Sequence, residues 1–420
     1  MDYQKPKGTA DLLPGTTGLW EKVEASVREV FREFGYRGIR TPMFEDYNVF
    51  SRNVGDTSDI VEKEMYDFHD KGDRHIALRP EGTAGVVRAY VENKLYGPEY
   101  PKPYKVYYMG PMFRYERPQS GRLREFHQMG VETFGTGSYL ADFEMIAMAN
   151  AILEALGIQQ VQLEINSIGC KNCRMQYQKA LKEFIAQKLD SYCDTCKTRF
   201  EKNPMRILDC KEKKCKENNQ GAPSILDYLC EDCKEHFTKL QELLKKNHID
   251  YVVNPEIVRG LDYYSKTVFE FVSQKEGFTI LGGGRYDYLV KELGGQDTKA
   301  VGFAIGMERL IELVKQTSLD KISETHPDLY IAQISEQEDE FVCQLKLALR
   351  KLGLQVESDL LRRSIKAQFK YANKIQAKYV ITIGETETQQ KAGEIKCMET
   401  GETEKIALEP EAIAQHLQKK

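Results

Sequence analysis

Residues 108–128 decide the fold, and they read YMGPMFRYERPQSGRLREFHQ. Strand-like runs lie at either end of this stretch, at residues 105–108 and 126–134. Pro118 and Gly121 lie between the two runs, and both residue types favour a reversal of the chain. The pattern therefore predicts a long antiparallel hairpin.

The hairpin is rich in arginine, with four of these residues between positions 114 and 124. Arginine offers a rigid fork of donors that matches the oxygens of carboxylates and phosphates. Phe113, Tyr115 and Phe126 lie among the arginines and are suited to stacking on a base. The segment therefore suits a nucleoside triphosphate, although a solvated charged hairpin fits the same pattern.

Regular elements are predicted on both sides of the hairpin. Apolar residues at helical spacing predict helices over residues 16–34 and 141–156. Strand-like runs follow at residues 161–166 and 257–271. We interpret residues 1–325 as one domain that contains the hairpin.

The composition changes over residues 171–253, where Lys and Glu are frequent and strand signals are few. We interpret this segment as a helical insertion in the first domain. Eight of the ten cysteines lie in or beside it, as Cys170-x2-Cys173, Cys193-x2-Cys196, Cys210-x4-Cys215 and Cys230-x2-Cys233. Such spacing is typical of metal ligands.

Two interpretations of these cysteines stay open. Two CxxC pairs can form a four-thiolate zinc site, for which the preferred set is Cys193, Cys196, Cys230 and Cys233. Alternatively they are free thiols, since ten cysteines without an export signal argue against a disulfide framework. Free thiols are favoured, so zinc is possible but no metal ligand is assigned.

Residues 326–420 show a regular alternation of strands and helices, which predicts a separate α/β domain with a largely parallel sheet. A helix predicted over residues 361–377 carries basic residues at spacings of three or four, namely Arg363, Lys366, Lys370, Lys374 and Lys378. Apolar residues take another face of this helix. A basic face opposite an apolar face suits a docked helix that contacts phosphates, and a solvated face is the alternative.

The bulk composition is that of an ordinary globular protein, with 41% hydrophobic and 30% charged residues. No apolar run approaches the roughly 18 residues that a membrane span needs. The first residues lack the basic start and apolar stretch of a signal peptide. We therefore expect a cytoplasmic protein with no membrane partner. Because the net charge is −4, a nucleic acid would have to meet a local basic patch.

The hairpin and the segment GFAIGMERL at residues 302–310 resemble motifs 2 and 3 of class II aminoacyl-tRNA synthetases. The segment KGTADLLP at residues 7–14 resembles motif 1, which builds the dimer interface in that class. Two more segments, VRGLDYY at 258–264 and GGGRYD at 282–287, are similar to the histidyl-tRNA synthetase family of the bacterial type. The resemblance runs in order over nearly the whole chain.

The resemblance implies an α+β catalytic domain on a mainly antiparallel sheet with flanking helices, a helical insertion and a C-terminal α/β anticodon-binding domain. It implies a homodimer that activates L-histidine with ATP, releases pyrophosphate and transfers histidine to the 3′ end of tRNA(His). Mg²⁺ is expected to bridge the phosphates of ATP and to be held mainly by the nucleotide.

The resemblance also implies a role for particular residues. The catalytic residues are Arg114, on the α-phosphate and the substrate carboxylate, and Arg259, a second cation across from it. The histidine site consists of Glu81, Gly82, Thr83, Arg114, Gln128, Glu132, Arg259, Tyr263 and Tyr264. The ATP site consists of Arg114, Glu116, Phe126 and Arg309. The tRNA site consists of Gln119, Arg122, Lys366 and Lys370.

Two other functions fit the same scaffold. One is the histidine-sensing regulatory subunit of ATP phosphoribosyltransferase, a binding module that we expect to lack the motif arginines or the C-terminal domain. The other is an ATP-dependent amino-acid ligase of the asparagine synthetase type, which we expect to lack the segment RGLDYY and the basic C-terminal helix. The presence of Arg114, Arg259 and Arg309 favours the synthetase.

Overall fold

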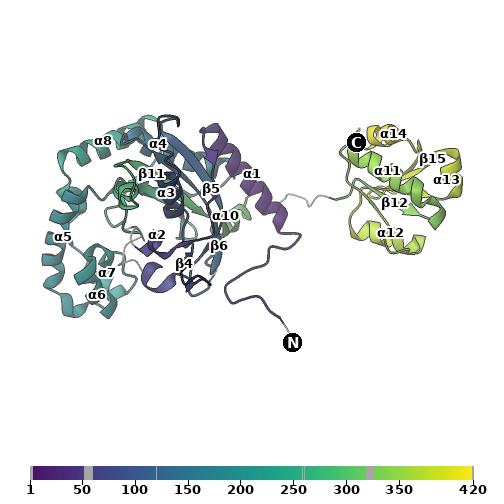
Figure 1. Ribbon diagram of the computed structural model, residues 1–420. Helices are drawn as coiled ribbons and strands as arrows, with labels where there is room; N and C mark the ends of the chain where they lie inside the picture. Colours follow the sequence, from purple (N-terminus) through teal and green to yellow (C-terminus); the bar gives the residue numbers. More distant parts are fainter. Residues whose placement is uncertain are drawn as a thin grey trace. The chain divides into compact units, whose positions relative to one another are not determined.

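The structure is a computed structural model that describes residues 3–51, 60–119, 121–257, 259, 261–317 and 326–418. The chain divides into two compact units, Met1–Lys321 and Ile322–Lys420 (Figure 1). The boundary predicted at residue 325 lies outside the described residues. No helix among the described residues is long and apolar enough to cross a membrane.

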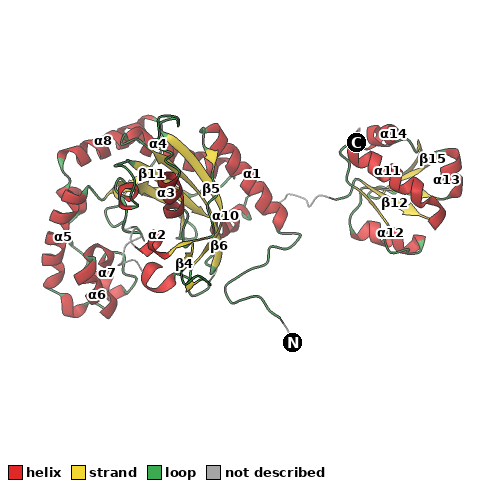
Figure 2. Cartoon of the chain, in the orientation of Figure 1, coloured by secondary structure: helices red, strands yellow, loops and turns green. Residues whose placement is uncertain are grey.

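The first unit is built on an eight-stranded sheet with the strand order β1-β5-β6-β11-β10-β9-β7-β8 (Figure 2). The strands are β1 (Arg37–Gly38), β5 (Tyr104–Phe113), β6 (Glu125–Phe134), β7 (Val161–Ser167), β8 (Val252–Val253), β9 (Ser265–Ser273), β10 (Thr279–Arg285) and β11 (Ala300–Gly306). Neighbours run antiparallel except at the two edges, where β1 meets β5 and β8 meets β7 in parallel. The mainly antiparallel sheet is therefore confirmed.

The hairpin predicted around residues 108–128 is confirmed as β5 and β6. The two strands pair from Tyr104 opposite Phe134 to Phe113 opposite Glu125. At the tip, the backbones of Gln119 and Arg122 exchange hydrogen bonds of 3.1 and 2.9 Å. Gly121 turns the chain there with a φ of +67°, a conformation that favours glycine.

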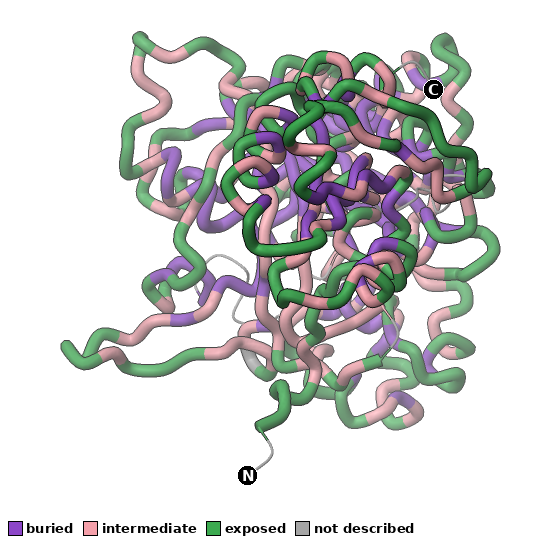
Figure 3. The backbone as a smooth tube through the Cα atoms, turned by 90° about the vertical axis from the view of Figure 1, so that its right-hand side faces the viewer, coloured by how far each residue is buried: buried purple, intermediate pink, exposed green. Residues whose placement is uncertain are grey.

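Helices cover both faces of this sheet. One face packs against α1 (Thr17–Glu33), α4 (Tyr139–Ala155), α8 (Glu231–Lys246) and α10 (Met307–Val314). Buried apolar residues of these helices and of the strands form one core cluster. The other face packs with α3 (Thr83–Glu92) and α5 (Lys171–Ala186). In Figure 3 the buried segments are purple, and the chain ahead of α1 is mostly exposed and green. Because side chains alternate along a strand, the central strands contribute residues to the helix-covered clusters on both faces of the sheet.

The remaining elements of the first unit are short or helical. A separate sheet that was not predicted has the order β2-β4-β3, with β2 (Phe44–Asp46), β3 (Asp67–His69) and β4 (His75–Leu78). Short helical segments are α2 (Tyr47–Ser51), a π-helix (Ile60–Glu64) and α9 (Leu289–Glu292). Between β7 and β8 the chain is helical, with α5, α6 (Asp194–Lys202), α7 (Lys213–Asn218), α8 and 3-10 turns at Leu189–Ser191, Pro204–Ile207 and Ile225–Tyr228.

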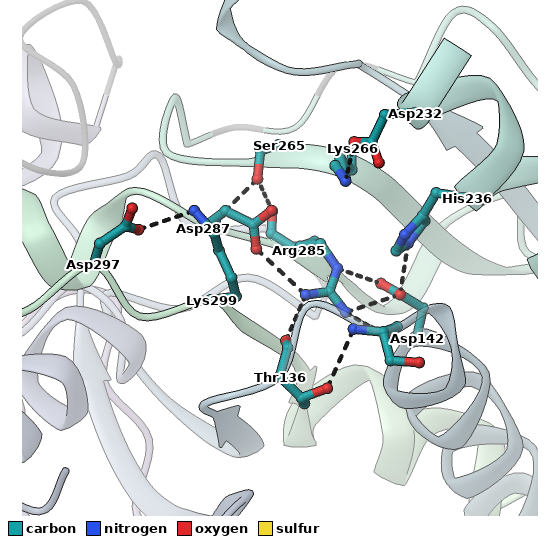
Figure 4. A network of polar contacts seen from close by, with 11 residues as sticks. Thr136, Asp142, Asp232, His236, Ser265, Lys266, Arg285, Asp287, Asp297 and Lys299 are labelled. Atoms are coloured by element: carbon teal, nitrogen blue, oxygen red, sulfur yellow. Dashed lines mark hydrogen bonds and ion pairs between the residues drawn. The ribbon is translucent and has the colours of Figure 1, made fainter. Parts of the chain in front are cut away.

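A buried ion pair joins three elements of the first unit (Figure 4). Arg285 of β10 is fully buried, and its guanidinium donates to both carboxylate oxygens of Asp142 in α4, at 2.9 and 3.1 Å. His236 of α8 lies 2.9 Å from the same carboxylate. The backbone oxygens of Thr136 and Ser138 accept further N–H donors of Arg285. Asp142 of α4 therefore contacts both Arg285 of β10 and His236 of α8 and joins the three elements.

The second unit has a five-stranded sheet with the order β13-β12-β14-β15-β16. Its strands are β12 (Leu329–Gln333), β13 (Val356–Ser358), β14 (Tyr379–Ile383), β15 (Ala392–Cys397) and β16 (Thr403–Ala407). Helices α11 (Asp339–Lys351) and α14 (Pro410–Gln418) pack in one apolar cluster and α12 (Ile365–Lys374) packs in another, and α13 (Glu385–Gln390) is short. The first three strands are parallel, as predicted, whereas the antiparallel β15–β16 hairpin was not predicted.

The basic helix is shorter than predicted, which changes the basic stripe. Residues 361–364 and 375–377 lie outside α12. Arg363 therefore precedes the helix and pairs with Asp359, and Lys378 follows it and pairs with Asp328 at 2.8 Å. The five-residue stripe was wrong at both ends, and Lys366, Lys370 and Lys374 remain as exposed lysines on α12.

We expect Asp142→Ala to lower the free energy of unfolding by about 3 kcal/mol, because the buried Arg285 would keep only the Asp287 carboxylate, 3.3 Å away, as an ionic partner. Urea unfolding can be followed by the fluorescence of Trp20, the single tryptophan, which lies in α1. The matched control is Asp297→Ala, which breaks an exposed pair with Lys299 and should cost at most about 1 kcal/mol. Equal losses in the two variants would contradict the structural role of Arg285.

Candidate active site

The face of the sheet opposite α1 and α4 presents polar and small side chains at its centre. Gln128 and Glu132 of β6 point to this face, whereas Met129 and Val131 between them join the apolar core on the other face. Gly302 of the neighbouring β11 makes room for Glu132, since a Cβ there would lie 2.0 Å from a carboxylate oxygen. The pleat of the strands thus separates a polar site from the core.

A small cavity of about 160 Å³ lies on this face. It is lined by Glu81, Thr83, Arg114, Gln128, Glu132, Arg259, Leu261, Tyr263, Tyr264, Gly282, Tyr286, Gly302, Phe303 and Ala304. Every residue predicted for the histidine site lies in this lining except Gly82. Gly82 precedes α3 and packs on the Tyr108 ring, where a Cβ would lie 2.1 Å from a ring carbon.

Glu132 is the most deeply buried carboxyl group in this lining, with 1% of the residue exposed. The Thr83 hydroxyl donates to one carboxylate oxygen at 2.7 Å, and the Tyr286 hydroxyl donates to the other. Burial raises the pKa of Glu132 to about 8, although both hydrogen bonds lower it. A second carboxyl, that of Glu81, also raises it. Glu132 is therefore protonated near neutral pH in the ligand-free protein, and a donor or a cation in the cavity would favour its carboxylate form, which accepts hydrogen bonds.

Glu81 is held by the first turn of α3. The backbone N–H groups of Thr83 and Ala84 donate to its two carboxylate oxygens at 2.8 and 2.7 Å. Burial raises the pKa of Glu81, and these backbone donors oppose that effect. Next to it in the lining, the side-chain oxygen of Gln128 is buried and has no hydrogen-bond partner among the described residues. Both groups offer oxygen acceptors to a cationic amine.

The Arg259 side chain lines the small cavity and packs on the glycine backbone of β10. Its guanidinium lies over Gly282, where a Cβ would come within 2.4 Å of Nη1, so the strand must carry glycine there. The guanidinium pairs with Glu270 of β9 and lies 5.6 Å from the centre of the Tyr264 ring. Burial alone would lower the pKa of Arg259, but the charge of Glu270 and the contacts with Tyr264 raise it above its usual value. Arg259 is therefore a cation at every working pH.

Arg114 lies at the junction of the small cavity and a larger one of about 710 Å³. Its Nε donates to the backbone oxygen of Pro80 at 2.8 Å, and its guanidinium lies 5.1 Å from the centre of the Phe126 ring. Arg114 and Arg259 both line both cavities. They are the two charged residues that the two linings share, beside Gln128, Leu261, Gly282 and Ala304.

The larger cavity contains the predicted ATP-site residues Arg114, Glu116, Phe126 and Arg309. Glu116 lies 3.8 Å from Arg114 and 3.4 Å from Arg122. Arg309 donates to the backbone oxygen of Thr279 at 2.8 Å, and burial together with the charge of Arg122 lowers its pKa. The lining of this cavity thus combines six arginines with the ring of Phe126, which suits a polyphosphate attached to a base.

The residues predicted to contact tRNA belong to both units, with Gln119 and Arg122 bridged at the hairpin tip of the first unit. Gln119 is at the hairpin tip and lines neither cavity, whereas Arg122 lines the larger cavity beside Glu116. Lys366 and Lys370 belong to the second unit. Both lysines are therefore considered within the second unit only.

Two residues of the site were not assigned a role from the sequence. Tyr286 donates to Glu132, and it could have been found because it follows the triple glycine in the segment GGGRYD. Glu270 pairs with Arg259, and its only signal is a charged residue among the apolar residues of a predicted strand. The pairing across strands that gives Glu270 its role cannot be read from spacing.

The structure changes the expected grouping of the cysteines. Cys193 and Cys196 lie with Cys210 and Cys215, whereas Cys230 and Cys233 lie with Cys170 and Cys173. The preferred quartet of Cys193, Cys196, Cys230 and Cys233 was therefore wrong. The reason is the path of the chain. The start of α5 lies beside the start of α8, whereas the start of α6 lies beside the loop and helix α7 that carry Cys210 and Cys215.

Comparisons with known proteins match the two units of the chain separately. A family model described as Histidyl-tRNA synthetase matches residues 8–310, and one described as Anticodon binding domain matches residues 328–419. The Histidine–tRNA ligase of Lactiplantibacillus plantarum is 50% identical over 413 residues, which cover 97% of each chain. That of Clostridium perfringens is 48% identical over 410 residues, covering 97% of this chain and 98% of the relative.

A solved structure has the same architecture. The apo crystal structure of S. aureus histidyl-tRNA synthetase superposes with a TM-score of 0.82 at 35% sequence identity. The match covers 99% of this chain and 100% of that chain. Sequence and structure therefore point to the same family along nearly the whole length.

We expect Glu132→Gln to remove a pH-dependent loss of stability. With a folded pKa of about 8 and an ordinary value of 4.5, Glu132 is protonated in the folded protein and ionised in the unfolded chain between these pH values. Unfolding then releases a proton, so the contribution of Glu132 is full below pH 4.5 and is lost as pH rises through about 8. Relative to Glu132→Gln, the wild-type free energy of unfolding should fall by up to about 1.4 kcal/mol per pH unit.

The measurement is urea unfolding of the two ligand-free proteins at several values from pH 5 to pH 8.5. A difference in unfolding free energy that stays constant, or that grows in favour of the wild type as pH rises, would contradict the buried, protonated state of Glu132.

Proposed function

The chain belongs to the histidyl-tRNA synthetase family, and we propose that it activates L-histidine with ATP and transfers the histidine to the 3′ end of tRNA(His). The observation that carries this proposal is the shared lining of the two cavities by Arg114 and Arg259. It gives an amino-acid pocket and a nucleotide pocket a common boundary that contains two cations. That boundary is where an amino-acid carboxylate would meet the α-phosphate of ATP.

Histidine fits the small cavity by its three polar groups. Its imidazole N–H would donate to Glu132, whose carboxylate is fixed by Thr83 and Tyr286. A site built around a buried acceptor rejects analogues without the donor, because the acceptor would stay unpaired. The α-ammonium group would meet the oxygens of Glu81 and Gln128. The carboxylate would then face the junction with the larger cavity.

In the first step, a carboxylate oxygen of histidine attacks the α-phosphorus of ATP and pyrophosphate leaves. Negative charge spreads over the phosphoryl oxygens as the bond forms. Arg114 and Arg259 can stabilise that charge from two sides, and fixed cations of this kind supply most of the catalysis in phosphoryl transfer. Arg309, deeper in the larger cavity, would bind the departing phosphates.

Adenine would occupy the larger cavity beside Phe126 and Glu116. Phe126 offers a stacking surface on which Arg114 already lies. The Glu116 carboxylate can accept from the exocyclic amine of adenine. Mg²⁺ fits this cavity as well, since the carboxylates of Glu116 and Glu270 border it and hard oxygen ligands suit Mg²⁺. When bound, Mg²⁺ neutralises charge on the phosphates.

In the second step, a 3′-terminal ribose hydroxyl of the tRNA attacks the carbonyl carbon of the histidyl-adenylate, and AMP leaves. We propose that the hairpin tip, with Gln119 and Arg122, meets the acceptor end. The exposed lysines Lys366 and Lys370 of α12 would meet tRNA phosphates. The homodimer and the cytoplasmic location stay predictions from the sequence.

The direct test is histidine-dependent exchange of pyrophosphate into ATP, followed by charging of tRNA(His). We expect both activities in the purified chain. A regulatory histidine-binding protein would show neither, and an amino-acid ligase of another kind would show exchange without charging. Either outcome would overturn the proposal.

We expect Arg259→Gln to lower kcat of the exchange reaction by about 10²–10³-fold, equivalent to about 3–4 kcal/mol of transition-state stabilisation. The substitution keeps a polar side chain and removes the cation that faces the α-phosphate. Arg74→Gln is the control, because Arg74 is an exposed arginine in the turn between β3 and β4. A loss below 10-fold at Arg259, or an equal loss at Arg74, would contradict the assigned role.

We expect the double variant Lys366→Glu with Lys370→Glu to raise the KM for tRNA by at least about 10-fold, since phosphate contacts are lost and repulsion is added. Histidine-dependent pyrophosphate exchange should not change. The matched control reverses two exposed lysines elsewhere in the second unit, Lys351→Glu with Lys405→Glu. An unchanged KM for tRNA, or the same rise in the control, would show that α12 is not a tRNA-binding face.

A further inference from the structure

The eight cysteines of the helical segment form two groups of four, which take no part in the proposed reaction. We define the stem cluster as Cys170, Cys173, Cys230 and Cys233, and the wall cluster as Cys193, Cys196, Cys210 and Cys215. Within each cluster the four sulfur atoms all lie within 4.8 Å of one another. None of the eight forms a disulfide, and the other two cysteines of the chain, Cys343 and Cys397, lie in the second unit.

The spacing of the sulfur atoms matches the ligands of one metal ion. A tetrahedral zinc ion with Zn–S bonds of about 2.3 Å places its four sulfur atoms about 3.8 Å apart. The sulfur atoms of Cys170 and Cys173 are 3.5 Å apart, and those of Cys193 and Cys210 are 3.9 Å apart. Both clusters therefore have the size of a four-thiolate zinc site.

The backbone around the cysteines is also that of a metal knuckle. Cys170, Cys193 and Cys230 each immediately precede a helix, as the N-cap residues of α5, α6 and α8. Their partners in the three CxxC pairs lie in the first turn of the same helices. A helix start directs N–H groups at the pair, which favours the thiolate form.

Backbone N–H groups also reach sulfur atoms from across each cluster. The N–H of Cys230 donates to the sulfur of Cys173 at 3.2 Å, and the N–H of Cys193 donates to the sulfur of Cys215 at 3.4 Å. Each bond joins segments far apart in sequence. Such N–H donors are the hydrogen-bonding partners expected around metal-bound thiolates.

Packing as free thiols does not explain this convergence. A buried free cysteine behaves as a small apolar residue with a weak S–H donor, and nothing favours bringing four of them together. Here four cysteines from at least two elements meet twice in one segment, and three of the four members of the wall cluster are buried. We propose that the stem cluster and the wall cluster each bind one zinc ion through four thiolates.

The chemistry of the ligands narrows the choice of metal. Four thiolates are soft ligands and exclude Mg²⁺ and Ca²⁺, which require oxygen. An iron–sulfur cluster distributes its four thiolates over two or four iron atoms, so sulfur atoms bound to different irons lie farther apart than the ligands of a single ion. Each Zn²⁺ replaces the four thiol protons, which are released to solvent, and leaves a site with a net charge of −2.

The two sites would fix different parts of the insertion. The stem cluster joins the start of α5, just after β7, to the start of α8, which packs on α4. The wall cluster lies beside the larger cavity, whose lining includes Cys193 and Cys210 together with Arg199, Asp209 and Lys211. Zinc in the wall cluster would therefore hold one wall of the nucleotide cavity in place.

The test is metal analysis of the full chain, purified without chelator and measured for zinc and iron by mass spectrometry. We expect two zinc ions per chain. Cys230→Ser should leave about one, and so should Cys193→Ser, because each variant removes one ligand from one cluster. Cys343→Ser is the control and should keep both, since Cys343 is an exposed cysteine of the second unit. Fewer than two zinc ions in the wild type, or iron in their place, would overturn the proposal.

A measurement on the wild type covers the case in which the serine variants do not fold. Chain produced with cobalt in place of zinc should show thiolate-to-cobalt charge transfer and the visible bands of tetrahedral Co²⁺, with an intensity that corresponds to two ions. Folded chain that lacks these bands, or shows bands for one ion only, would contradict the proposal. Neither readout depends on aminoacylation, so failure of the zinc proposal and failure of the proposed function can be told apart.

Discussion

The site depends on keeping the guanidinium groups of Arg114 and Arg259 charged in the lining that the two cavities share. A buried cation is costly unless it is paired and hydrogen-bonded. Arg259 meets this need with Glu270 and the Tyr264 ring, and it fits only because Gly282 carries no side chain. Arg114 meets it with the Pro80 carbonyl and the face of Phe126. The glycine at position 282, the carboxylate of Glu270 and the ring of Phe126 therefore all serve to stabilise these two charges.

The amino-acid pocket is rich in fixed carboxyl groups. Glu132 and Glu81 are both buried, and each is held by donors from the protein, namely the hydroxyls of Thr83 and Tyr286 in one case and the first turn of α3 in the other. Their burial raises both pKa values, so a ligand that brings a donor or a positive charge is favoured. In the proposed function, selectivity for an amino acid with an imidazole would follow from where these oxygens are fixed.

Local patterns were sufficient for much of the fold and the site. The hairpin, α1 and α4 follow from alternation and helical spacing, and the matched motifs named eight of the residues that line the small cavity. Long-range pairing was beyond reach: Glu270 meets Arg259 only because β9 lies beside β10, and the cysteines group by the positions of helix starts. The ends of α12 were missed because ion pairs, rather than helix continuation, engage Arg363 and Lys378.

The central claim is that the histidine carboxylate meets the α-phosphate between Arg114 and Arg259. The most direct measurement is a crystal structure of the chain with a non-hydrolysable analogue of histidyl-adenylate, in which a sulfamate replaces the phosphate. We predict that the imidazole lies within about 3 Å of the Glu132 carboxylate, with the sulfamate between the two guanidinium groups and adenine on Phe126. An imidazole in the larger cavity, or a sulfamate that contacts neither arginine, would contradict it.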